Sequence, residues 1–145
     1  MDNKRTQPIG IELVKRGIVT ENDINKALEY QKTHSSKRIG DILNELQLCD
    51  PYRLIKEIGD ILGEKSILLN IEDVKLNITD YISIDTAKKN RAIPFEVGAG
   101  KIKVCFADGT NKRMVDTMRL LFLNKGLIME RYITFDSRVS HILEA

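Results

Sequence analysis

Residues 8–31 read PIGIELVKRGIVTENDINKALEYQ, and residues 38–61 read RIGDILNELQLCDPYRLIKEIGDI. The two stretches carry one pattern, because most landmarks of the first recur thirty positions later in the second, as Gly10 and Gly40 do. An internal repeat defines the structural unit of a chain. Each copy is too short to bury a core alone, so we expect the two copies to pack against each other.

The first copy predicts two helices. Apolar residues at helical spacing indicate a helix that begins at Ile9, directly after Pro8, and ends at Gly17. Thr20 offers an N-cap oxygen, and Asp23 follows three residues later in a box-like arrangement. The next helix is expected to place one face at Ile24, Ala27, Leu28 and Gln31.

The second copy repeats this plan after a polar connection over residues 32–37. A helix is expected from Ile39 or Gly40, and its apolar positions include Ile42, Leu43 and Leu46. Asp50 then serves as an N-cap, with Pro51 at the first helical position. The closing helix has an apolar stripe formed by Leu54, Ile55, Ile58, Ile61 and Leu62.

The sequence period changes after Gly63. Residues 92–97 and 102–106 flank a glycine turn and predict a β-hairpin. Further strands are expected over residues 67–69 and 127–135, and helices over residues 84–90, 111–124 and 139–143, the last after a cap at Asp136 or Ser137. The predicted fold is α+β. It has a four-helix tandem-repeat bundle over residues 1–63, and then a small α/β sandwich-like subdomain with a mixed sheet over residues 64–145.

Composition favours an ordinary soluble protein, because 42% of the 145 residues are apolar and 30% are charged. The net charge of +2 does not argue for nucleic acid. We find no apolar run long enough to span a membrane and no signal peptide. Cys49 and Cys105 lie far from each other and from both histidines, which disfavours a disulfide or a metal site. We expect a cytoplasmic setting.

No catalytic motif is found, so we expect no enzyme activity and no cofactor. Residues 59–66, GDILGEKS, resemble a phosphate-binding loop only superficially. A Walker motif needs four residues between its glycines and a lysine directly after the second, and neither condition holds. The sequence also lacks a nucleophile elbow and a dinucleotide fingerprint.

The segment Lys37-Arg38-Ile39-Gly40 is the strongest candidate for ligand binding. Arg38 adds a planar fork that can pair with phosphate or with a guanine edge. The expected helix start presents free N–H groups, and glycine allows close approach to the backbone. Ile9 and Gly10 are expected to repeat this helix start without the arginine. The alternative is a plain helix start with a surface arginine and a packing glycine.

The apolar residues of the repeat allow two interpretations as well. They either form the core, which is the commoner use of such spacing, or line a slot for flat rings. Gln31 either binds a ligand or caps a neighbouring backbone group. The apolar positions concerned are Ile9, Ile24, Leu28, Ile39, Leu54 and Ile58.

The two copies approximate the pattern R-L-G-x-x-L-L-x-x-G, six residues, L-x-x-x-L-x-x-Q. This tandem pattern resembles the N-terminal domain of the assembly ATPases of type II secretion and type IV pili (the MshE, PilB and GspE group). The resemblance continues downstream and covers most of the chain. The downstream matches are Leu62-Gly63, Ile67-Leu68-Leu69, Ala92-Ile93-Pro94-Phe95 and Val104-Cys105-Phe106-Ala107-Asp108.

In that family the tandem repeat binds cyclic di-GMP and regulates a motor domain. The resemblance implies a ligand site formed by Ile9, Gly10, Leu13, Ile24, Leu28 and Gln31 from the first copy, by Arg38, Ile39, Gly40, Leu43, Leu54 and Ile58 from the second, and by Asp108. It implies an ATPase motor domain and an inner-membrane platform protein as partners, at the cytoplasmic face of the membrane. The alternative is a protein-docking module that couples the ATPase to this platform and has lost the nucleotide.

Four positions depart from the family pattern, and the spacer between the copies is about one residue longer than usual. Pro8 replaces the first arginine, and Ile61 replaces the final glutamine, so each copy lacks one polar anchor. Asn44 stands at an apolar position and Gln47 at a glycine. A guanine edge left without a partner costs about 1–3 kcal/mol, so these departures predict weaker binding.

Overall fold

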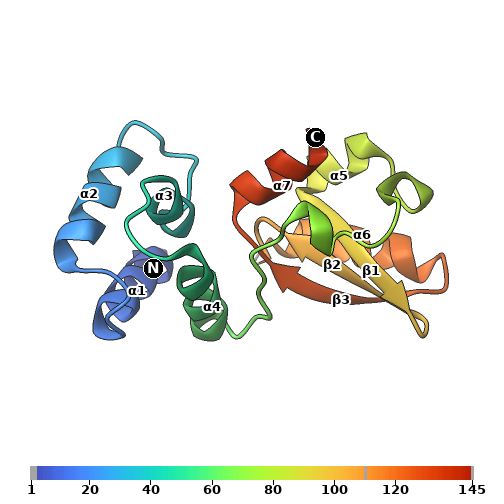
Figure 1. Cartoon of the computed structure of the whole chain (residues 1–145), viewed down its shortest axis with the longest axis horizontal. Coiled ribbons are helices and arrows are strands. Elements are labelled where there is room, and N and C mark those ends of the chain that lie inside the picture. Colours follow the sequence, from blue (N-terminus) through green and yellow to red (C-terminus); the bar gives the residue numbers. More distant parts are fainter. Residues whose placement is uncertain (1–2, 110, 145) are drawn as a thin grey trace. The chain divides into compact units, whose positions relative to one another are not determined.

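The computed structural model describes residues 3–109 and 111–144. The chain divides into two compact units, with the boundary between Gly63 and Glu64. Within the described residues, seven α-helices and one three-stranded sheet form an α+β fold, as the sequence predicts (Figure 1). We refer to the units as the helical unit and the sheet unit, and describe each separately.

The helical unit contains the two predicted helix pairs. The first copy forms α1 (Asn3–Lys15) and α2 (Glu21–Gln31), and the second forms α3 (Ile39–Glu45) and α4 (Pro51–Leu62). Both predicted caps are present: Thr20 Oγ1 accepts from the Asp23 N–H at 3.1 Å, and Asp50 Oδ2 accepts from the Arg53 N–H at 3.0 Å. The capping box at Thr20 is complete.

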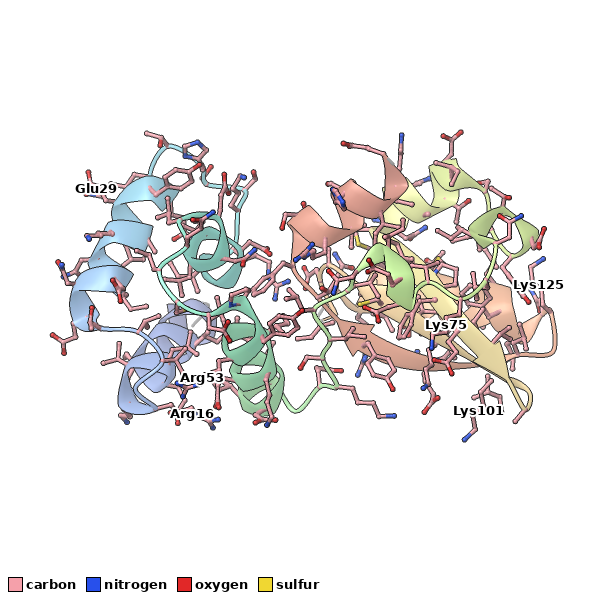
Figure 2. All side chains as sticks on the ribbon, viewed as in Figure 1. Arg16, Glu29, Arg53, Lys75, Lys101 and Lys125 are labelled. Atoms are coloured by element: carbon pink, nitrogen blue, oxygen red, sulfur yellow. The ribbon has the colours of Figure 1, made fainter. Side chains whose placement is uncertain are left out.

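The two copies pack against each other, as expected. Helix α1 lies against α4, and α3 lies against both α2 and α4, so the first helix of each copy contacts the second helix of the other. Charged side chains such as Glu29 project outward from these helices (Figure 2). The core between them is formed by fully buried side chains, including Leu13, Ala27, Ile42, Leu43 and Leu54.

The start of α1 differs from the prediction. The helix begins at Asn3, so Pro8 lies inside it instead of preceding it, and Ile9 and Gly10 do not form a helix start. Residues 4, 5 and 7 are Lys, Arg and Gln, which have good helix propensity. A proline at this position removes its own backbone hydrogen bond and crowds the carbonyl four residues earlier, at a cost of about 3 kcal/mol, so the helix extends through Pro8 against the local preference. The symmetry expected between Gly10 and Gly40 is therefore absent.

The first helices of the two copies end in the same way despite different residues. Gly17 has a φ of 74°, and Gln47, thirty positions later, has a φ of 56°. The following residues make equivalent bonds: the Ile18 N–H donates to Leu13 O at 3.0 Å, and the Leu48 N–H donates to Leu43 O at 3.2 Å. The second copy thus keeps the left-handed helix end without the glycine that favours it.

We expect Gln47→Gly to raise the free energy of unfolding by about 1 kcal/mol, because a residue with a side chain is strained in the left-handed region. Gly17→Gln should lower it by a similar amount, since a Cβ on Gly17 meets no atom within 4 Å and only the backbone is strained. Urea denaturation of both variants checks this pair. Equal effects of the same sign would contradict it.

The sheet unit contains α5 (Ile84–Asn90), β1 (Ala92–Gly98), β2 (Lys101–Phe106), α6 (Lys112–Leu123), β3 (Ile128–Ile133) and α7 (Asp136–Leu143). The strand order is β1-β2-β3, with β1 antiparallel and β3 parallel to β2, so the sheet is mixed as predicted. One core cluster joins the sheet to α5 and α6, and another joins it to α7. This layering agrees with the predicted sandwich-like subdomain.

Residues 67–69 do not form the predicted strand. Only Ser66 bridges β3, at Ile133, and the Ile67 N–H donates to Ile133 O at 3.0 Å. The chain then turns away, because the Leu69 N–H donates to Thr134 Oγ1 at 3.3 Å and short 3-10 turns follow at Ile71–Asp73 and Ile78–Asp80. The apolar character of this run reflects burial of Leu68 and Leu69 instead of strand pairing.

The N-terminus of α7 also differs from the prediction. The helix begins at Asp136, so the N-cap is Phe135, whose side chain makes no capping bond. Phe135 is 2% exposed, which indicates that core packing sets this helix start. Within the described residues, none of the helices has the length and hydrophobicity needed to cross a membrane.

Candidate functional site

The candidate segment lies where α2 is connected to α3. Arg38 is the N-cap residue of α3, with φ −87° and ψ 155°, and its side chain makes no capping hydrogen bond. Its carbonyl oxygen accepts from the Ile42 N–H at 3.0 Å, which begins the helix. Because α3 spans only seven residues, its dipole is short, and the cationic character of the segment comes mainly from Lys37 and Arg38.

Gln31 is brought to this segment. Its Nε2 donates to the carbonyl oxygen of Lys37 at 2.9 Å, so the last residue of α2 holds the residue that precedes Arg38. Of the two uses considered for Gln31, this contact is the capping of a neighbouring backbone group. Any ligand contact from Gln31 would have to use the second N–H of its side-chain amide or its side-chain carbonyl oxygen.

A polar cluster that the sequence did not reveal surrounds the same connection. Tyr30 Oη donates to Glu45 Oε2 at 3.0 Å, and Lys37 Nζ donates to Glu45 Oε1 at 2.7 Å. Lys37 and then Tyr30 lower the pKa of Glu45, while the bond to Glu45 raises the pKa of Tyr30. The Tyr30 ring also stacks on His34, with ring centroids 3.9 Å apart.

The two repeat glycines bring helices close together within each copy. A Cβ on Gly10 would lie 3.5 Å from Ile24 Cδ1, and a Cβ on Gly40 would lie 2.7 Å from Ile58 Cδ1. Gly40 in particular has no room for a side chain unless Ile58 moves. Gly40 therefore has a packing role, whether or not a ligand also approaches it, whereas a Cβ on Gly10 would make only ordinary van der Waals contact.

The predicted apolar contacts divide into core and surface residues. Leu13, Leu43 and Leu54 are fully buried, and Ile39 and Ile58 are 5% and 6% exposed. Ile9 and Ile24 are half-buried, whereas Leu28 is 46% exposed. The core interpretation suits the buried group, and Leu28 is the best placed to offer apolar surface to a ligand. The contact of each residue with a ligand stays a prediction.

Asp108 lies in the sheet unit, shortly after the end of β2, while the other twelve predicted residues lie in the helical unit. Its participation also stays a prediction. In the part of the chain that the structure describes, His, Cys, Asp and Glu side chains form no group of three or more that could hold a metal ion.

No protein-family model matches the chain, and no curated protein matches its sequence. Solved structures do match. The structure of MshE with cdg (cyclic di-GMP) superposes with a TM-score of 0.65 at 18% identity, covering 94% of this chain and 96% of that one. The N-terminal domain of XpsE superposes with a TM-score of 0.59 at 19% identity, covering 94% of this chain and 91% of that one.

Both matches extend over the helical unit and the sheet unit, so they concern the whole arrangement of elements along the chain. The chain therefore shares the fold of the MshE structure and of the N-terminal domain of XpsE. MshE belongs to the group that the tandem repeat resembles, so the resemblance is confirmed at the level of the fold.

Proposed function

We propose that this chain is a non-catalytic regulatory domain that binds cyclic di-GMP and acts on the motor domain of a pilus or secretion ATPase at the cytoplasmic face of the membrane. The tandem repeat at thirty-residue spacing carries the proposal. The likeness to MshE, a protein solved with cyclic di-GMP, supports it because it spans 94% of this chain.

Within this proposal the accessible residues have distinct roles. Arg38 offers paired donors to a phosphate or to the O6 and N7 edge of guanine. Leu28 offers exposed apolar surface to a base. The buried leucines hold the helices that carry these two residues. Ligand binding regulates the motor by favouring one domain arrangement over another, which requires different affinities in the two arrangements.

A protein-docking module that has lost the nucleotide is the second candidate. Pro8 and Ile61 favour it, because both replace polar anchors of the family pattern. The Gln31 amide favours it too, since it is already bonded to Lys37 O. In this case the helical unit would contact the inner-membrane platform protein directly and would not respond to the nucleotide.

Calorimetric titration with cyclic di-GMP separates the two candidates. We expect one ligand per chain with a micromolar or tighter dissociation constant, and no comparable heat with ATP. A thermal shift on adding the ligand should accompany binding, because a ligand that binds only the folded state stabilises it. Absence of both heat and thermal shift at high micromolar ligand would favour the docking module.

A further inference from the structure

Hydrogen bonds of Lys37 hold the connection between the two repeat copies in place. The Lys37 N–H donates to His34 O at 3.0 Å, its carbonyl oxygen accepts from Gln31 Nε2 at 2.9 Å, and its Nζ donates to Glu45 Oε1 at 2.7 Å. The first two contacts come from α2 and the connection itself. The Glu45 contact ties the connection to the far end of α3.

Glu45 accepts hydrogen bonds from one donor before this connection and from another at its end. Tyr30 on α2 and Lys37 before α3 bond to different oxygens of the one carboxylate. The Tyr30 ring is itself fixed by stacking on His34, with an interplanar angle of 5°. Glu45 therefore closes a loop of contacts from the end of α2, through residues 32–37, to the last residue of α3.

From this geometry we infer that Glu45 is a positioning residue for Arg38: by holding Lys37 and Tyr30, it fixes the connection in the conformation that presents the Arg38 guanidinium to an anionic nucleotide. The inference rests on the proposed function. Glu45 acts through its neighbours and is absent from the thirteen predicted ligand contacts. Its loss should leave the fold intact, because partly exposed ion pairs contribute little to stability.

The charge of Glu45 makes the inference sharply testable. Cyclic di-GMP carries two phosphates, so simple Coulomb repulsion predicts that removing a nearby carboxylate would strengthen binding. A positioning role predicts weaker binding instead. Without the Glu45 contacts, a smaller fraction of the protein has the connection in the binding-competent conformation, and the apparent dissociation constant rises as this fraction falls. The sign of the effect therefore distinguishes the two mechanisms.

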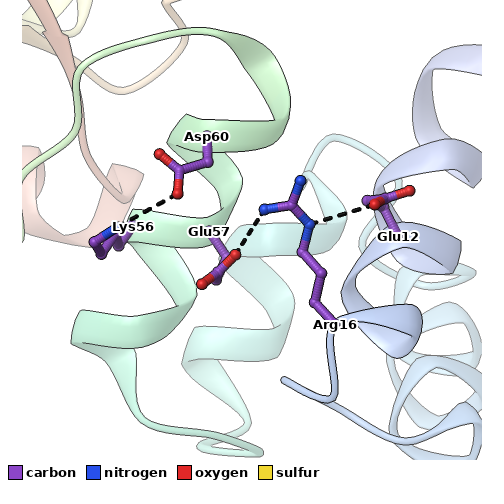
Figure 3. Close-up of polar contacts among 5 residues, drawn as sticks. All are labelled: Glu12, Arg16, Lys56, Glu57 and Asp60. Carbon is purple, nitrogen blue, oxygen red and sulfur yellow. Dashed lines mark hydrogen bonds and ion pairs between the residues drawn. The ribbon is translucent and has the colours of Figure 1, made fainter.

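We expect Glu45→Gln to raise the dissociation constant for cyclic di-GMP about five- to tenfold. Tyr30→Phe, which removes one bond and no charge, should raise it about twofold. Glu57→Gln is the matched control. Glu57 on α4 also accepts a 2.7 Å ion-pair contact, from Arg16 directly after α1, but lies outside the connection (Figure 3). This control should leave affinity unchanged or slightly stronger.

Hydrogen exchange of the Lys37 amide in the ligand-free protein gives a second readout, because local opening sets its rate. Exchange should be faster in Glu45→Gln than in the wild type and unchanged in Glu57→Gln. Affinity in Glu45→Gln that equals or exceeds that of Glu57→Gln would overturn the inference. If the wild type binds no cyclic di-GMP, the proposed function fails, and Arg38 positioning fails with it. Faster exchange of the Lys37 amide in Glu45→Gln would then show only that Glu45 holds the connection in place.

Discussion

Leu54→Ala is expected to lower the free energy of unfolding of the helical unit by about 2–5 kcal/mol, the usual cost of removing a buried leucine side chain. Leu54 is fully buried on α4 between the two copies. Leu28 lies on α2, the second helix of the first copy, and is 46% exposed, so Leu28→Ala should cost only about 1 kcal/mol or less. The two substitutions are chemically identical and lie on the second helices of the two copies, so each is the control for the other.

Chemical denaturation of both variants measures the difference, provided that unfolding is two-state. Titration with cyclic di-GMP should show the reverse order: Leu28→Ala keeps the fold and weakens binding, while the folded fraction of Leu54→Ala binds normally. Equal stability losses would mean that the exposed side of α2 is covered in solution. Normal affinity in Leu28→Ala would remove this residue from the site.

The parts of the fold that depend on local chemistry were predictable from the sequence. Thr20 and Asp50 cap their helices as expected because a side-chain oxygen bonds an N–H three residues away, and no distant residue is involved. The thirty-residue repeat likewise placed the four helices in order. Pairing of the copies followed from the physical need to bury two short apolar faces.

The failures have non-local causes. Residues 67–69 have the composition of a strand, but their backbone continues to Thr134 and into 3-10 turns instead of along β3. Sequence periodicity cannot distinguish a buried strand from a buried connection. The repeat also suggested equal environments for Leu28 and Ile58, whereas packing leaves Leu28 46% exposed and Ile58 only 6% exposed.

The Glu45 cluster was not predictable for a related reason. Glu45 lies fifteen residues from Tyr30 and eight from Lys37, spacings that correspond to no helical pair. The sequence offered ligand binding or backbone capping as the use of Gln31, and its observed partner is a backbone carbonyl six residues away. Sequence reasoning thus singled out Arg38 and Gln31 as candidates but missed the contacts that hold their surroundings.

Arg38→Ala is expected to weaken cyclic di-GMP binding by about 1.5–3 kcal/mol, equivalent to roughly 10- to 150-fold in the dissociation constant, in the range of charge-assisted hydrogen bonds. No arginine at the start of the first copy can compensate, because Pro8 holds that position. The fold should persist. Arginine is not a preferred N-cap residue and its side chain makes no capping hydrogen bond, so the start of α3 does not depend on it.

Two further variants separate charge from geometry at Arg38. Arg53→Ala removes the same charge from an exposed position on α4 and should change affinity little. Arg38→Lys keeps the charge but not the planar fork, so it should recover only part of the lost affinity. Full recovery by lysine would indicate that Arg38 contributes only charge near a phosphate. Unchanged affinity in Arg38→Ala, with the wild type still binding, would place the ligand elsewhere on the helical unit.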